Sequence, residues 1–147
     1  MEHLGRHVII ELWGCNDGIN DAVRVKQVML AAVKAANATL LNINVHTFSP
    51  HGVTGVAVLS ESHLSVHSWP EFGYLAADVF TCGETTRPEA AVDVFREFFH
   101  PTRVELHTLK RGVFHEAIGP DGERQIVPEQ DTIEYYEDEV DETAVVA

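Results

Sequence analysis

Only two stretches of this chain carry helical periodicity, and this limits how its strands can be covered. Apolar residues recur at helical spacing over residues 22–36 and again along Ala91, Phe95, Phe98 and Phe99. The other patterned segments are short, rich in β-branched and aromatic residues, and bounded by turn residues, as is typical of β-strands. These predicted strands are residues 7–13, 40–48, 53–59, 63–69, 74–82 and 103–109.

Two helices cannot cover both faces of a sheet of five or six strands. We therefore expect an α+β fold, a two-layer sandwich whose mainly antiparallel sheet carries both helices on one face. The other face must then be hydrated or meet a second subunit, because a large exposed apolar surface usually marks an interface.

Acidic residues are concentrated at the C-terminal end. The 147 residues include 23 acids and 10 bases, a formal charge of −13, which argues against nucleic acid as a partner. Residues 121–147 hold ten acids and Arg124 as their single base, so they contribute −9 and residues 1–120 contribute −4. We expect a folded domain over residues 1–120 and a flexible acidic tail over residues 121–147.

The location of the protein is predicted from features that the chain lacks. Two cysteines, Cys15 and Cys82, are too few for a disulfide framework, and no charged-then-apolar signal precedes the first predicted strand. No apolar run has the length of a membrane span. We expect a cytoplasmic protein that does not bind membranes.

Residues 52–83 concentrate the side chains that could carry chemistry. If residues 63–69 form a strand, His63, Ser65 and His67 share one face. Their spacing places the Cα atoms of His63 and His67 roughly 13 Å apart, too far for one metal ion to bind both side chains. We therefore expect no metal site. Cys82 is either a small buried apolar residue or a nucleophile activated by His67, as in a cysteine hydrolase.

Three motifs match a known family. The segments LGRHVIIELWGC, GVTG and LSESHLSVHSWPEFGYLAADVFTCG closely resemble the bacterial and archaeal S-adenosylmethionine decarboxylase proenzymes over about residues 4–118. This resemblance implies a pyruvoyl enzyme that cuts itself between Glu61 and Ser62, giving a β chain (residues 1–61) and an α chain (residues 62–147). Ser62 then becomes a covalent pyruvoyl group, and no separately bound organic cofactor is needed.

The resemblance also implies roles for individual residues. His67 is the proton acceptor in processing, and Cys82 is the proton donor that completes decarboxylation. Thr54 stands where the family often has serine, and it keeps the hydroxyl that supports processing. The implied reaction converts S-adenosylmethionine to decarboxylated S-adenosylmethionine and CO2 for spermidine synthesis. The implied assembly is a homodimer of processed αβ pairs with sites near the subunit interface.

Three residues are predicted to contact the substrate. Phe48 and Trp69 could stack on adenine or face the sulfonium ion, and Glu71 could accept hydrogen bonds from ribose. The alternative for both aromatic residues is packing in the core. Two alternatives remain for the function: the same pyruvoyl chemistry on arginine or ornithine, or a non-catalytic interaction module.

Overall fold

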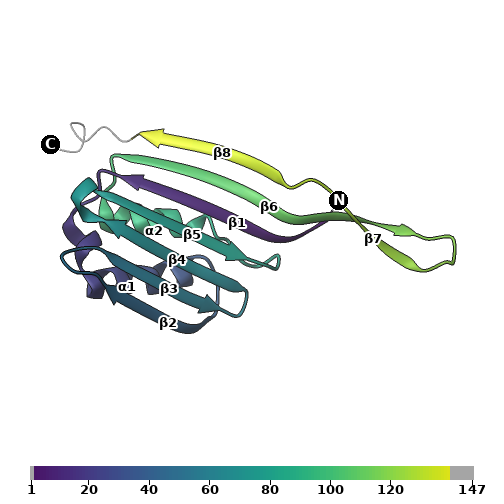
Figure 1. Cartoon of the computed structure of the whole chain (residues 1–147), viewed down its shortest axis with the longest axis horizontal. Helices are drawn as coiled ribbons and strands as arrows, with labels where there is room; N and C mark the ends of the chain where they lie inside the picture. The colour runs from purple at the N-terminus through teal and green to yellow at the C-terminus, as the bar shows by residue number, and fades with distance from the viewer. Residues whose placement is uncertain (1, 140–147) are drawn as a thin grey trace.

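One antiparallel sheet organises the fold, and both helices cover the same face of it (Figure 1). The computed structural model describes residues 2–139. The helices are α1 (Ala22–Ala35) and α2 (Ala90–Phe99). The predicted two-layer α+β sandwich is confirmed. The described strands are β1 (Glu2–Trp13), β2 (Leu40–Thr47), β3 (Val53–Leu59), β4 (Ser62–Trp69), β5 (Tyr74–Thr81), β6 (Arg103–Ile118), β7 (Arg124–Pro128) and β8 (Thr132–Glu139).

The strand order is not the order of the sequence. Neighbouring strands follow the order β2-β3-β4-β5-β1-β6-β7, and β8 pairs with β6 as well. Strands β2 to β5 form a simple meander, whereas β1 is inserted between β5 and β6. The first strand of the chain therefore lies inside the sheet.

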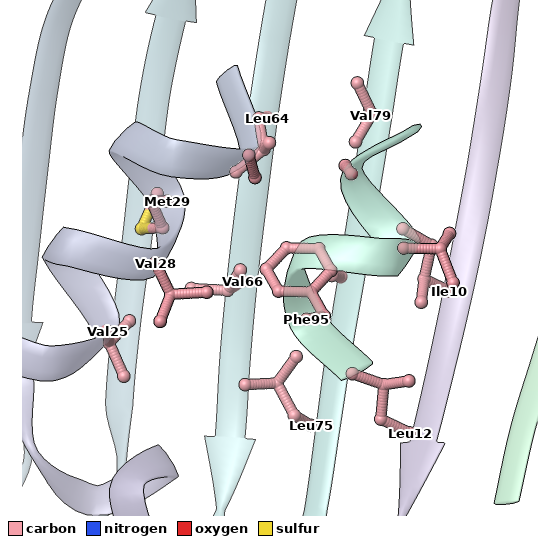
Figure 2. Close-up of a cluster of buried hydrophobic side chains, with 14 of the residues drawn as sticks. Ile10, Leu12, Val25, Val28, Met29, Leu64, Val66, Leu75, Val79 and Phe95 are labelled. Carbon is pink, nitrogen blue, oxygen red and sulfur yellow. The ribbon is translucent and has the colours of Figure 1, made fainter. Parts of the chain in front are cut away.

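The core fills the space between the sheet and the two helices (Figure 2). Helix α1 begins where the Asp21 side chain accepts hydrogen bonds from the backbone N–H groups of Val23 and Arg24. At Gly55 on β3 an added Cβ would lie 2.4 Å from the Met29 sulfur, so a larger residue there would force the buried Met29 side chain to shift. Fully buried side chains of this core include Ile10, Leu12, Val25, Val28, Met29, Leu64, Leu75, Val79, Phe95 and Phe99.

The second face of the sheet carries no helix, and we call it the open face. Alternation along β4 buries Leu64 and Val66 under the helices and leaves His63, Ser65 and His67 on the open face. This confirms the predicted shared face of these three residues. Four apolar side chains of this face remain 40–45% exposed: Trp13, Val56, Val58 and Trp69.

The acidic C-terminal segment differs from the expected flexible tail. Strand β6 continues to Ile118, beyond the predicted end at residue 109, and forms with β7 a hairpin that projects past the sandwich (Figure 1). Strand β8 then pairs with the first half of β6. Ion pairs offset the like charges that favoured a tail, with Asp138 at 2.6 Å from Arg96 and Glu137 at 2.9 Å from Arg103. The part of the predicted tail over residues 140–147 lies outside the described residues.

Neither helix within residues 2–139 has the length and apolar character needed to cross a membrane.

Candidate active site

The Glu61–Ser62 bond lies in the turn between β3 and β4. Thr39 holds this turn twice: its carbonyl accepts a hydrogen bond from the Ser60 N–H at 3.0 Å, and its N–H donates to Glu61 Oε1 at 2.9 Å. The second bond is the main cause of the lowered pKa of Glu61. Ser62 has a φ of +154°, a backbone conformation that side-chain-bearing residues rarely adopt. The backbone is thus strained at Ser62, on one side of the predicted cleavage point. On the other side, Thr39 holds Ser60 and Glu61 by hydrogen bonds.

Cys82 lies beside this bond, directly after the end of the neighbouring strand β5. Ser62 pairs in register with Thr81, and the Cys82 N–H donates a hydrogen bond to the Glu61 carbonyl oxygen at 3.0 Å. This carbonyl is the one that Ser62 would attack. The Cys82 side chain is exposed and its thiol is free, so it is not the buried apolar residue of the alternative prediction.

A cavity of about 350 Å³ opens next to Cys82. It is lined by residues 2–6 of β1, by residues 81–84 and by Phe114 of β6. The volume falls within the range of sites that bind small molecules. Ser62 does not line the cavity but lies one strand away, opposite Thr81.

His67 and Thr54 form a second group at a distance from Ser62. The two residues pair in register on the open face, and Thr54 Oγ1 lies 3.2 Å from His67 Nδ1. His67 follows Ser62 by five residues of an extended strand, which separates their Cα atoms by roughly 16 Å. Cys82, opposite Glu61, is about 20 Å from His67 by the same measure. Within one chain, the hydrolase-like pairing of Cys82 with His67 is therefore excluded.

The three predicted substrate-binding residues lie toward the His67 end of the sheet. Phe48 and Trp69 are 49% and 43% exposed, so neither belongs to the core. The Trp69 ring stacks on Tyr74 at 5.4 Å between centroids, and Phe48 meets His46 edge-on at 4.6 Å. Glu71 forms an ion pair with His51. The structure thus divides the predicted residues into a group around Glu61, Ser62 and Cys82 and a group around Thr54 and His67.

A cluster on the open face was not predicted from the sequence. His7 Nε2 on β1 and His63 Nε2 on β4 each lie 2.8 Å from Asp78 Oδ2 on β5, and Ser65 donates to Asp78 Oδ1. Burial raises the pKa of the Asp78 carboxyl, but the bonds from Ser65, His63 and His7 outweigh it and leave the pKa lowered. We call these four residues the Asp78 cluster.

One signal in the sequence could have revealed this cluster. Asp78 is the single charged residue of β5, and a half-buried carboxylate requires hydrogen-bond donors. The alternation of β5 places Asp78 on the same side as His63 and Ser65 across a hairpin. No comparable signal points to His7, because β1 reaches β5 only through the non-sequential strand order.

Proteins of a known family resemble this chain over most of its length. Residues 6–112 match the family described as S-adenosylmethionine decarboxylase. The proenzymes of that name from Methanococcus maripaludis and Thermomicrobium roseum are 49% and 54% identical to this chain, covering 80% and 77% of it and 97% of each relative. This chain belongs to the S-adenosylmethionine decarboxylase family.

Solved structures show the same fold. The adenosylmethionine decarboxylase of Aquifex aeolicus superposes with a TM-score of 0.74 at 35% identity, covering 80% of this chain and 98% of that one. The Trypanosoma brucei enzyme matches with a TM-score of 0.53 at 13% identity, covering 71% of this chain and 45% of that one. Strands β7 and β8 begin after residue 112 and lie outside the family match.

Proposed function

We propose that this chain is a self-processing, pyruvoyl-dependent decarboxylase that converts S-adenosylmethionine to decarboxylated S-adenosylmethionine and CO2. Its product supplies aminopropyl groups for spermidine synthesis. The observation that carries the proposal is the strained Ser62, whose preceding carbonyl accepts a hydrogen bond from Cys82. Membership in the family supports the choice of substrate.

The first reaction would be cleavage of the chain at Glu61–Ser62. Ser62 Oγ attacks the Glu61 carbonyl carbon and the C–N bond breaks, so that an ester replaces the amide and the Ser62 nitrogen becomes an amine. The Cys82 N–H is placed to stabilise negative charge on the Glu61 carbonyl oxygen as it develops.

Elimination would complete the processing. A base removes the α-proton of residue 62, the Cβ–Oγ bond breaks, and Glu61 leaves as a new C-terminal carboxylate. The dehydroalanine left at residue 62 tautomerises to an imine, and water hydrolyses this imine to a ketone with loss of ammonia. In this way the chain would make its own pyruvoyl group.

Decarboxylation would use the same end of the hairpin. The pyruvoyl group supplies an electrophilic ketone that condenses with the substrate amine and accepts the electron pair left by CO2. The Cys82 thiol, exposed at the edge of the adjacent cavity, would donate the proton that the α-carbon then takes up.

We assign the base to a second copy of the chain. His67, supported by Thr54, is roughly 16 Å from Ser62 in the same chain, so it cannot remove the α-proton there. Both residues lie on the open face, which also carries exposed apolar side chains. A two-fold homodimer through this face would pair Ser62 and Cys82 of one protomer with Thr54 and His67 of its partner.

The same assembly would gather the substrate contacts. Phe48, Trp69 and Glu71 lie toward the His67 end, so they would approach the ketone of the partner. There the exposed Phe48 and Trp69 rings could contact adenine or the sulfonium ion, and Glu71 the ribose. We further propose that residues 1–120 form the catalytic domain, and that the enzyme works in the cytoplasm, where its two free thiols would stay reduced.

Denaturing electrophoresis and mass spectrometry of the purified protein test the proposal. We expect fragments of residues 1–61 and 62–147, the second with a blocked N-terminus, and release of CO2 from S-adenosylmethionine. Ser62→Ala should leave the chain intact, whereas the matched control Ser60→Ala, two residues away, should still be cut. An intact wild-type chain after long incubation would overturn the proposal, and CO2 release only from arginine or ornithine would overturn the substrate assignment.

A further inference from the structure

The hydrogen bonds of the Asp78 cluster have a defined direction. The Arg111 guanidinium lies 3.3 Å from His7 Nδ1 and can only donate, so Nδ1 accepts and His7 carries its proton on Nε2. His7 therefore donates that proton to Asp78. The ligand atoms of His7, His63 and Asp78 all lie within 4.8 Å of one another, but a proton on Nε2 occupies the lone pair that a metal would need. The Asp78 cluster is therefore a set of hydrogen bonds to one carboxylate.

The Asp78 cluster fixes the side chain of His63. His63 is the first residue after Ser62, and its side chain is fixed to β5 through Asp78. Asp78 is in turn fixed to β1 through His7. His63 is thus tied by its side chain to two strands besides its own.

Cleavage makes this attachment important. In the uncut chain, residue 62 is held on both sides by the backbone. Once the 61–62 bond is broken, residue 62 becomes a chain terminus, and termini fray unless they are tied down. The reacting carbonyl at residue 62 must nevertheless stay opposite Thr81 and next to Cys82 for proton transfer.

We propose that Asp78 is a positioning residue which, through His63, holds residue 62 in register with β5 after the chain has been cut. This inference rests on the proposed function. Glu61, on the other side of the cut, is held separately by Thr39 and Cys82. The Asp78 cluster holds the C-terminal side of the cut, where residue 62 would carry the ketone.

Hydrogen exchange in cut and uncut protein isolates this role. Asp78→Asn is prepared in the self-processing chain and in the uncleavable Ser62→Ala chain, with the exposed Asp93→Asn as matched control. In the cut protein we expect amide exchange in residues 63–66 to rise about tenfold or more, as for local fraying. In the uncut protein the same substitution should change it little, because the backbone still holds residue 62.

Kinetics provide the second measurement. In the cut Asp78→Asn protein, kcat should fall by about 10- to 100-fold, as expected when reacting groups are misplaced by about 1 Å, with a smaller change in KM. His63→Ala should reproduce the loss, and adding Asp78→Asn to it should cost little more, because both changes break one connection. If Asp78→Asn fails to fold, the same exchange and kinetic measurements can be made on His63→Ala alone.

The outcomes separate the two proposals. Equal exchange in cut Asp78→Asn and cut wild-type protein, or additive losses in the double variant, would overturn the positioning role alone. Loss of kcat on treatment with a chelator would assign the cluster to a metal ion and overturn it as well. A wild-type chain that never cleaves would overturn the proposed function, and the positioning role with it.

Discussion

The backbone N–H of Cys82, the residue after β5, donates a hydrogen bond to the carbonyl oxygen of Glu61, the residue before β4, at 3.0 Å. One residue is thereby placed to take part in two proposed reactions with different atoms. Its N–H would serve the cleavage of the chain, and its thiol would serve decarboxylation. Because a side-chain substitution leaves the N–H in place, the two reactions can be separated experimentally.

Cys82→Ala is expected to cut itself but to turn over poorly. Cleavage should proceed because alanine retains the N–H that contacts Glu61. CO2 release should fall by about 10²- to 10⁴-fold, the usual contribution of a positioned proton donor. Fragment yield on a denaturing gel and a radiometric CO2 assay measure the two effects. Cys15→Ala is the control, and equal turnover in the two variants would contradict the assignment of the thiol.

The two cysteines should differ sharply toward alkylating reagents. Burial raises the pKa of the Cys15 thiol to about 12, so at pH 8 it stays protonated and unreactive, because only the thiolate attacks. The Cys82 thiol is exposed. Peptide mass spectrometry after iodoacetamide treatment should therefore find Cys82 labelled first, and Cys15 labelled only after unfolding or at strongly alkaline pH. Labelling of both residues at similar rates in the folded protein would contradict this expectation.

Co-expression of two inactive variants tests the shared site. Ser62→Ala lacks the nucleophile and His67→Ala lacks the base, so neither should process efficiently alone. In a mixed dimer, the His67→Ala chain keeps Ser62 and receives the partner's His67. Differently tagged chains should then show cleavage of the His67→Ala chain only. No cleavage in a mixed dimer that is shown to form would mean that the site does not span two protomers.

Strand pattern and side-chain parity allowed much of the fold to be predicted. Alternation placed His63, Ser65 and His67 on one face, and two amphipathic helices implied a sheet covered on one side. Distance along a strand also separates His63 from His67 on that face, by roughly 13 Å between their Cα atoms. These inferences succeed because they depend on neighbours in the sequence.

The failures involve contacts between segments far apart in the sequence. The contact of His7 with Asp78 depends on the insertion of β1 between β5 and β6, which no local pattern encodes. His67 and Ser62 belong to one sequence motif, but the extended strand between them separates their Cα atoms by roughly 16 Å. In the acidic segment, like charges favoured a tail, whereas the described part of it pairs with β6 and is partly neutralised by Arg96 and Arg103.

Removal of β8 is expected to affect solubility more than catalysis. Deleting residues 130–147 would expose the backbone of β6 over residues 103–110, a free edge that invites pairing with other chains. Light scattering should detect concentration-dependent association, and the thermal midpoint should fall by several degrees, the shift expected for about 1 kcal/mol. The control Arg124→Ala leaves β8 in place. Full loss of CO2 release in a soluble deletion variant would show instead that β8 belongs to the site.

The order of the strands also determines what becomes of the two fragments. The N-terminal fragment would contribute β1, β2, β3 and α1, and the C-terminal fragment the remaining elements. Because β1 lies between β5 and β6, and β4 pairs with β3, each fragment completes a sheet that the other cannot build alone. The two fragments should therefore remain associated after the cut. They should unfold in one thermal transition and separate only when the sheet itself unfolds.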